Sequence, residues 1–517
     1  MSDHRLTKAK SFRCIPIRRP FSNFDYVDEN FNGQPAIRRL FSQARSHHSK
    51  TFVVEDIDAD GIINEENEEI IRLYPDYQKG GLKRLTFWNR SFRNEDEFHR
   101  FGVDNLIGYA ILKRDLIPSR SYDDWHVFDS VIRKYPHHHN CMPVQTAFSV
   151  RAGGRSFDIQ GVLYCQQNNL NKACAQVALR SLCALHLPEA TLSYEKINQL
   201  AAKVTGKFNP SNGLDSAQIR SVLTGLGIGF SDMDYTALPP HERRAFPYQK
   251  FLYAGVESGA GALLGFEYKG PKAKGRRHII PFFGHTFNQD AWVPNAEVAY
   301  FHVGERTRYL PSEAWVSSFV GHDDNFGSNF CVPRLYVTRA QAQYVAALHL
   351  PEVRYSGVVA EAVAVEYLYS LLPYLNAIRG RWLKRLIRYA NQQQIVLRAV
   401  ALKRKEYVAH LRRIRDWQSH AENEKLCHAI EGFLPKMVWM VEVSVPELFP
   451  ANQRKLGEIV LDATRSAGPK LDFRTYCIAR FPSRFMLFKG LEMKGKPNFV
   501  SMPSGLKSHT PLYQAFS

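Results

Sequence analysis

Cysteine is scarce in this chain of 517 residues, and the eight cysteines present form no CxxC pair. A zinc ribbon or a thioredoxin-type site is therefore disfavoured. The start of the chain has no apolar segment of secretory length, and no uncharged apolar run reaches the roughly 18 residues of a membrane span. We therefore expect a cytoplasmic protein with free thiols and no membrane span.

Negative charge is also under-represented, since 50 Asp and Glu face 68 Lys and Arg and the formal net charge is +18. Between Leu371 and His420 there are 12 Lys and Arg against 2 Asp and Glu. Such a surplus favours acidic partners such as nucleic acid. Candidate contacts to a phosphate backbone share faces of predicted helices, and they are Arg381, Lys384, Arg385, Arg388 and Arg412. The alternative is a solvated helix face.

Hydrophobic and turn patterns divide the chain into four segments and predict an α+β protein. Residues 1–45 are basic and poor in apolar periodicity, so we expect a loosely ordered segment. Residues 46–155 alternate short apolar-aromatic runs with turns, which predicts a β-rich domain. Residues 156–338 read as helices followed by strands, including a strand at 250–255. Residues 339–517 combine basic helices with a small α+β unit that includes a helix near 451–465.

The densest group of reactive residue types is QQNNLNKACAQVALRSLC, residues 166–183. Cys174 stands where a predicted loop enters a predicted helix. The free N–H groups and positive dipole end of a helix start favour a thiolate, which is the nucleophilic form of cysteine. A side-chain amide near the nucleophile, such as that of Gln167 or Asn168, can donate to an oxyanion. The alternative is that Cys174 is a buried structural cysteine.

A lone nucleophilic cysteine needs a distant histidine, and RRHIIPFFGHTFNQDAWVP at residues 276–294 offers two. His278 opens an apolar strand and is the candidate base, with His285 as the alternative. Asp290, or alternatively Asn288, lies in the following turn and is the candidate group that orients the imidazole. We expect no metal here, because no nearby cysteine completes a ligand set.

Two further polar segments carry ligand-type side chains. HHHNC at 137–141 has residue types that bind transition metals, but we expect an exposed loop because three adjacent histidines cannot face one ion on a regular strand. GHDDNFGSNF at 321–330 holds His322, Asp323 and Asp324. It is a candidate for the edge of the active cleft, for a cation site or for a capped surface turn.

The order of these features resembles the papain-like cysteine peptidase fold, closest to the bacteriocin leader peptidases, with phytochelatin synthases as relatives. The resemblance covers about residues 156–305. In that branch a Gln lies six residues before the Cys, the Cys is usually followed by Gly, and the His opens a strand that ends in Gly. Here position 168 is Asn, with Gln167 one residue further away, and position 175 is Ala. The resemblance implies Cys174 as nucleophile, His278 as base, Asp290 as orienting acid, and Gln167 or Asn168 as oxyanion donor.

The activity implied is that of a cysteine peptidase or related acyl-transfer enzyme, which acts on a peptide or isopeptide-type bond of a peptide or protein and needs no cofactor. Water resolves the thioester in a hydrolase, and an amine resolves it in a peptide-forming transferase of the phytochelatin-synthase type. The remaining alternative is a non-catalytic protein that binds nucleic acid or another partner and keeps the papain-like core as a scaffold.

Overall fold

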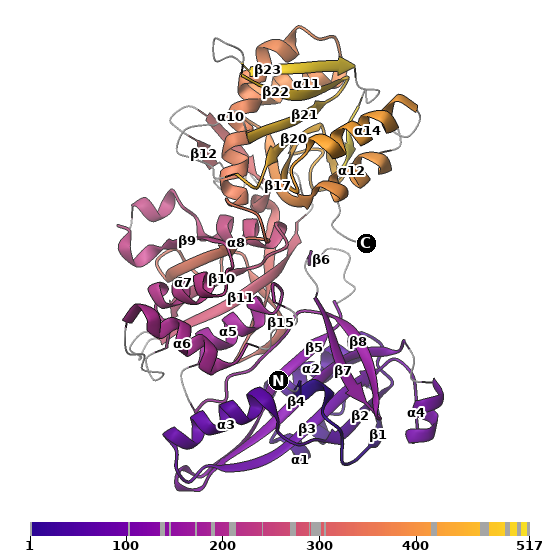
Figure 1. The fold of residues 1–517 in the computed structure, drawn as a ribbon, viewed down its shortest axis with the longest axis vertical. Coiled ribbons are helices and arrows are strands. Elements are labelled where there is room, and N and C mark those ends of the chain that lie inside the picture. The colour runs from indigo at the N-terminus through magenta and orange to yellow at the C-terminus, as the bar shows by residue number, and fades with distance from the viewer. Residues whose placement is uncertain are drawn as a thin grey trace.

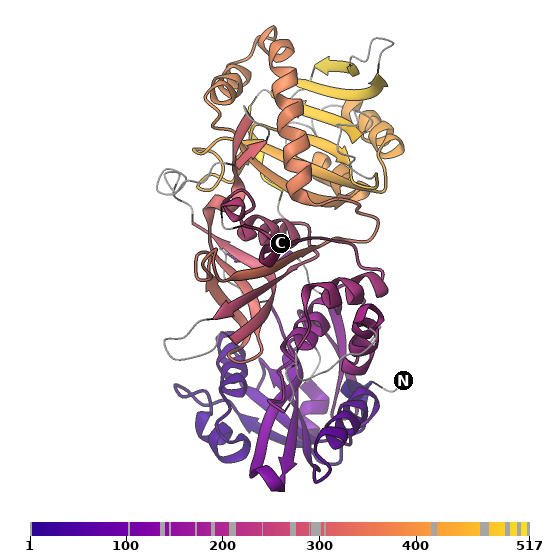
Figure 2. The same ribbon diagram turned by 90° about the vertical axis from the view of Figure 1, so that its left-hand side faces the viewer.

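The computed structural model has three lobes in a row along its long axis, with the N-terminal lobe at one end and the C-terminal lobe at the other (Figures 1 and 2). The architecture is α+β, with several separate sheets. The residues that the structure describes are 3–101, 104–134, 140–143, 146–170, 173–187, 192–205, 213–239, 241–268, 276–288, 290, 301–303, 307–414, 421–465, 475–491, 497–503 and 508–513.

The N-terminal lobe is built on an antiparallel sheet in the order β1-β2-β3-β4-β5. Its strands are β1 (Arg13–Pro16), β2 (Thr51–Asp56), β3 (Gln78–Trp88), β4 (Leu106–Ile117) and β5 (Tyr122–Ile132). Its helices are α1 (Phe24–Phe31), α2 (Pro35–Ser46), α3 (Gly61–Leu73) and α4 (Glu95–Phe101), and β7 (Thr146–Ala152) and β8 (Arg155–Gly161) form a hairpin.

The expectation that residues 1–45 are loosely ordered is wrong. Helices α1 and α2 cover one face of the sheet, where Phe31, Leu40 and Phe41 are fully buried. The apolar residues of α2 recur at helical spacing, but arginines and polar residues between them obscure the pattern. The β-rich character predicted for the following residues is present in β2 to β5.

The middle lobe has a sheet in the order β15-β14-β11-β10-β16-β9, in which every neighbouring pair is antiparallel. Its strands are β9 (Phe230–Asp234), β10 (Ala262–Tyr268), β11 (Arg276–Phe287), β14 (Val316–Asp323), β15 (Gly327–Pro333) and β16 (Ala342–Leu348). The short β6 (Asn140–Cys141) also pairs with β11. The helices are α5 (Cys174–Cys183), α6 (Tyr194–Thr205), α7 (Ser216–Gly225) and α8 (Tyr248–Glu257).

Two sequence predictions for this lobe need correction. Residues 250–255 belong to α8 and not to a strand, because the buried Tyr248, Leu252 and Val256 recur every four residues. The lobe also extends beyond 338, since β16 lies inside its sheet. The predicted helices are confirmed, and Asp215 caps α7 in a capping box with Gln218.

The C-terminal lobe has an eight-stranded sheet in the order β12-β13-β17-β18-β20-β21-β22-β23. These strands are β12 (Phe301–Val303), β13 (Thr307–Pro311), β17 (Val396–Lys403), β18 (Met437–Ser444), β20 (Gly457–Asp462), β21 (Tyr476–Phe481), β22 (Arg484–Leu491) and β23 (Pro497–Pro503), while β19 (Arg454–Lys455) pairs with β24 (Thr510–Pro511). Helices α10 (Gly357–Asn376) and α11 (Arg381–Asn391) pack on one face, and α12 (Arg404–Arg413) and α14 (Ala421–Phe433) pack on the other.

The chain reaches this lobe twice. It leaves the middle lobe after β11, contributes β12 and β13 to the C-terminal sheet, and returns as β14. The helix expected near 451–465 is wrong, because residues 457–462 form the fully buried β20.

Helix α10 is, among the described residues, the one helix whose length and composition would allow it to cross a membrane. Ten of its residues are buried, and Glu361 within it forms an ion pair with Lys250 of α8. A single helix of this kind is weak evidence, so the absence of a membrane span stays a prediction.

Candidate active site

The structure brings together the two residues that the sequence pairs as nucleophile and base. Cys174 is the first residue of α5, which packs against β11, and His278 lies near the start of β11. The Cys174 side chain lies close enough to the His278 imidazole to help raise its pKa, and it is half-buried. All eight cysteines of the chain are free, as expected. The thiol is therefore both accessible and close to a base.

The carboxylates at His278 come from the end of β14. Nε2 of His278 lies 3.2 Å from Oδ2 of Asp323 and 3.4 Å from Oδ1 of Asp324. The other Asp323 oxygen, Oδ1, accepts the backbone N–H groups of Asn325 at 2.8 Å and Phe326 at 3.1 Å. Both oxygens of Asp323 are thus engaged, which fixes the carboxylate and through it the imidazole.

The electrostatics of this group favour a charged imidazole. Burial alone would lower the pKa of His278, but hydrogen bonds with Asp323 and Cys174 and the charges of Asp323 and Asp324 raise it to about 10. Burial raises the pKa of Asp324 to about 6. Burial also acts to raise the pKa of Asp323, but the hydrogen bond and charge of His278 outweigh it, so that pKa is lowered. An imidazolium next to a thiol favours the thiolate.

The predicted orienting group, Asp290 or Asn288, is wrong. His278 and Phe287 are nine residues apart on β11, which at the rise of a strand is about 30 Å. Asp290 is exposed beyond the far end of that strand, where its N–H donates to Oδ1 of Asn288. The acid comes instead from β14, because this strand runs antiparallel to β11 and returns the chain to the end at which His278 lies.

His285, the alternative base, is also excluded from this site. It lies seven residues further along β11 than His278, or roughly 23 Å at the rise of a strand. Its side chain is fully buried, and its Nε2 is 2.6 Å from Oε1 of Glu257.

The two candidate oxyanion donors have different surroundings. The amide of Asn168 is buried, donates to Oε1 of Glu66 at 2.9 Å and accepts the backbone N–H of Leu170 at 3.0 Å, so it holds the loop together. Gln167 is more exposed, and its Nε2 donates to Oδ1 of Asn325 at 3.2 Å. Asn325 directly follows Asp324, so this hydrogen bond connects Gln167 to the turn that carries the two aspartates.

A small hollow borders Cys174, and it is lined by Cys165, Cys174, Val177, Ala178, Ser181, Ile279, Pro281, His322 and Asp324. Oδ2 of Asp324 is buried there without a hydrogen-bond partner among the described residues. Burial lowers the pKa of His322 to about 3. Its neutral ring accepts the N–H of Asn329 at Nδ1 and contacts the carbonyl oxygen of Val162 through Nε2. His322 therefore positions the β14–β15 turn and takes no part in proton transfer at neutral pH.

Two groups of described side chains have ligand-type atoms within 4.8 Å of one another. One is His278 with Asp323 and Asp324, at the site above, and the other is Cys141 with Glu257 and His285. In the His-rich segment at 137–141, the three histidines lie outside the described residues. The polar segment at 321–330 was a candidate for the edge of the cleft, and it supplies both aspartates.

The predicted basic face is present on α11. Arg381, Lys384, Arg385 and Arg388 are all exposed, while Leu383 on the same helix is buried. Arg412 lies on α12 instead, and its guanidinium forms an ion pair with Glu424 of α14 at 2.7 Å. Of the basic residues predicted to contact phosphate, the four on α11 therefore form one continuous exposed face.

The chain was compared with protein-family models, with curated proteins and with solved structures, and none of the three comparisons gave a match.

Proposed function

We propose that this protein is a cysteine-dependent acyl-transfer enzyme that acts on a peptide or isopeptide-type bond. The observation that supports it is the convergence of Cys174, His278 and Asp323 from α5, β11 and β14. A nucleophile, a base and an orienting carboxylate in contact are the parts that thiol acyl transfer needs. A papain-like fold for the middle lobe, with the enzyme in the reducing cytoplasm, belongs to the same proposal.

In the first half of the reaction the Cys174 thiolate attacks the substrate carbonyl carbon. A C–S bond forms, and the carbonyl electrons move onto the oxygen. Two donors are available for that oxyanion. One is the Gln167 amide, and the other is the backbone N–H of Cys174, because the first N–H groups of a helix have no acceptor within it. The His278 imidazolium then gives its proton to the leaving amine, and a thioester remains.

In the second half of the reaction the neutral His278 accepts a proton from the incoming nucleophile. Water gives a carboxylic acid and defines a hydrolase, and an amine gives a new amide and defines a transferase. Asp323 stays ionised throughout and holds Nε2 of His278. The other ring nitrogen, Nδ1, is then the one that gives and accepts the proton. The half-buried position of Cys174 favours a substrate segment with little bulk at the reacting residue.

The acyl-enzyme tests this proposal directly. The full chain is mixed with simple activated acyl esters, and its mass is measured intact and after peptide mapping. We expect an acyl adduct on Cys174 that Cys174→Ala lacks and that a chelator leaves unchanged. An added amine acceptor then separates transferase from hydrolase by its product. An adduct that forms equally in Cys174→Ala, or that needs a divalent metal at His278, Asp323 and Asp324, contradicts the proposal.

A second candidate function rests on α11, where four cationic side chains share one exposed face. Phosphate contacts of this kind give binding that weakens steeply with salt. If the lobe binds nucleic acid, replacing Arg381, Lys384, Arg385 and Arg388 together by Glu abolishes retention on heparin at low salt. Unchanged retention of that variant excludes the α11 face.

A further inference from the structure

A second group of cysteine, histidine and carboxylate lies where the middle and C-terminal lobes meet. Cys141 of β6 is directly opposite His285 of β11 in the antiparallel register, and such neighbours have Cβ atoms about 4.5–5.5 Å apart. Glu257, the last residue of α8, has its Oε1 2.6 Å from Nε2 of His285 and 3.9 Å from Sγ of Cys141. Sulfur, nitrogen and oxygen atoms from three elements therefore converge on one point.

The histidine of this group is fixed in position by the residues around it. Its side chain is completely buried, and its ring packs against Tyr253 and Phe287 with centroid distances of 5.2 Å and 4.5 Å. Its Nε2, the ring nitrogen that faces Glu257, is therefore held in a fixed position from which it can bind an ion.

The carboxylate is oriented from behind by Arg398 of β17, whose Nε and Nη2 both donate to Oε2 of Glu257, at 3.0 Å and 2.8 Å. This leaves Oε1 directed at His285 and Cys141. A partner that fixes the far oxygen of a carboxylate in this way is typical of the groups that support metal ligands.

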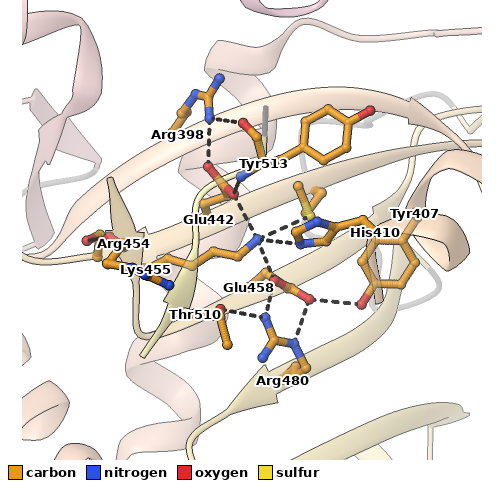
Figure 3. Close-up of polar contacts among 12 residues, drawn as sticks. Arg398, Tyr407, His410, Glu442, Arg454, Lys455, Glu458, Arg480, Thr510 and Tyr513 are labelled. Atoms are coloured by element: carbon orange, nitrogen blue, oxygen red, sulfur yellow. Dashed lines mark hydrogen bonds and ion pairs between the residues drawn. The ribbon is translucent and has the colours of Figure 1, made fainter. Parts of the chain in front are cut away.

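Behind Arg398 a buried chain of opposite charges continues into the C-terminal sheet (Figure 3). Arg398 pairs with Glu442, Glu442 with Lys455, Lys455 with Glu458, and Glu458 with Arg480. Including Glu257, three acidic and three basic side chains balance.

We propose that Cys141, Glu257 and His285 bind a divalent transition-metal ion of the zinc type. Zinc takes sulfur, nitrogen and oxygen ligands, and its bond lengths put tetrahedral ligand atoms about 3.4–3.6 Å apart. The Cys141–Glu257 separation of 3.9 Å is already close to this, and the His285–Glu257 separation of 2.6 Å has to open by roughly 1 Å. Three protein ligands leave a fourth position for water or an outside ligand.

Cobalt(II) is the probe, because a cobalt–thiolate bond gives a charge-transfer band in the near ultraviolet. The full chain, reduced and treated with a chelator that is then removed, is titrated with Co²⁺ alone. We expect one Co²⁺ per chain, a thiolate band, and loss of that band when Zn²⁺ is added. The absence of a thiolate band at saturating Co²⁺ overturns the proposal.

Matched variants locate the ion. Cys141→Ser removes the band, whereas Cys331→Ser, at an exposed cysteine, and Cys174→Ala, at the active-site cysteine, keep it. If the band is lost in Cys174→Ala and kept in Cys141→Ser, the ion binds at the other cluster and this proposal is overturned. That result does not by itself contradict the proposed acyl-transfer reaction. Peptide mapping of the unmutated chain gives a check that does not depend on the folding of a variant, since Zn²⁺ must slow alkylation of Cys141. Equal alkylation with and without Zn²⁺ contradicts the proposal.

Discussion

Replacing Asp323 by Asn tests whether this carboxylate sets the charge of the His278 imidazole. The pKa of His278 rises from the ordinary 6.5 to about 10, a difference of about 3.5 units or roughly 5 kcal/mol in favour of the imidazolium. Asp323 contributes to that rise through both a hydrogen bond and a charge. An opposite charge in contact is worth about one to three pKa units. We therefore expect the pKa of His278 in Asp323→Asn to lie near 7–9.

The assay is an NMR titration of ¹⁵N-labelled histidine rings, with the His278 signals assigned by their loss in His278→Gln. Asp290→Asn is the matched control, because Asp290 is the acid that the sequence favours and lies at the far end of β11. The reasoning is refuted if the pKa of His278 is the same in Asp323→Asn as in the unmutated chain, or if Asp290→Asn lowers it. The raised pKa also implies a stability term, fully present below about pH 6.5 and lost as the pH rises through about 10.

Further predictions concern the loop before Cys174 and the buried charges. Asn168→Ala leaves Glu66 without its amide partner and should lower the free energy of unfolding by about 1–3 kcal/mol, measured by urea denaturation. Gln167→Ala should leave that free energy nearly unchanged and slow acylation of Cys174 by about 10²–10³-fold, as loss of an oxyanion donor does. An Asn168→Ala chain of full stability, or a Gln167→Ala chain acylated at the full rate, contradicts these assignments. Lys455→Met strips the buried Glu442 and Glu458 of their shared cation and should cost about 3–5 kcal/mol. Lys436→Met, at a side chain that is 75% exposed, should cost less than about 1 kcal/mol in the same denaturation measurement. Equal costs for the two lysines exclude a stabilising role of the buried chain.

The proximity of Cys174 and His278 could be predicted because each residue has a local signal. A cysteine at a helix start and a histidine that opens an apolar strand are visible within a few residues of sequence, and the structure brings Cys174 and His278 together. The orienting acid has no such signal, because its distance from His278 along the chain depends on the detour through β12 and β13. Only the register of β14 against β11 shows that Asp323, and not Asp290, returns to the imidazole.

Other features of the structure also depend on contacts between residues that are far apart in the sequence. Which of Gln167 and Asn168 is available as an oxyanion donor depends on Glu66 of α3, about a hundred residues away. Glu66 accepts a hydrogen bond from the Asn168 amide. Cys141 and His285 are opposite each other only because β6 pairs with β11, so no spacing in the sequence indicates a shared site. The sequence pattern does not predict helices α1 and α2, because a few apolar residues on one face are enough to pack them against the sheet.

Competition among the cysteines for a thiol-directed electrophile at neutral pH tests whether Cys174 and His278 form a thiolate–imidazolium pair. Burial raises the pKa of both Cys165 and Cys183 to about 12, so their thiolate fractions at pH 7 are on the order of 10⁻⁵. We expect iodoacetamide to label Cys174 first, and we expect His278→Gln to slow this labelling at least about tenfold through loss of the imidazolium. Labelling of Cys174 at the same rate in His278→Gln, or no faster than at Cys183, would contradict a thiolate–imidazolium pair at this site.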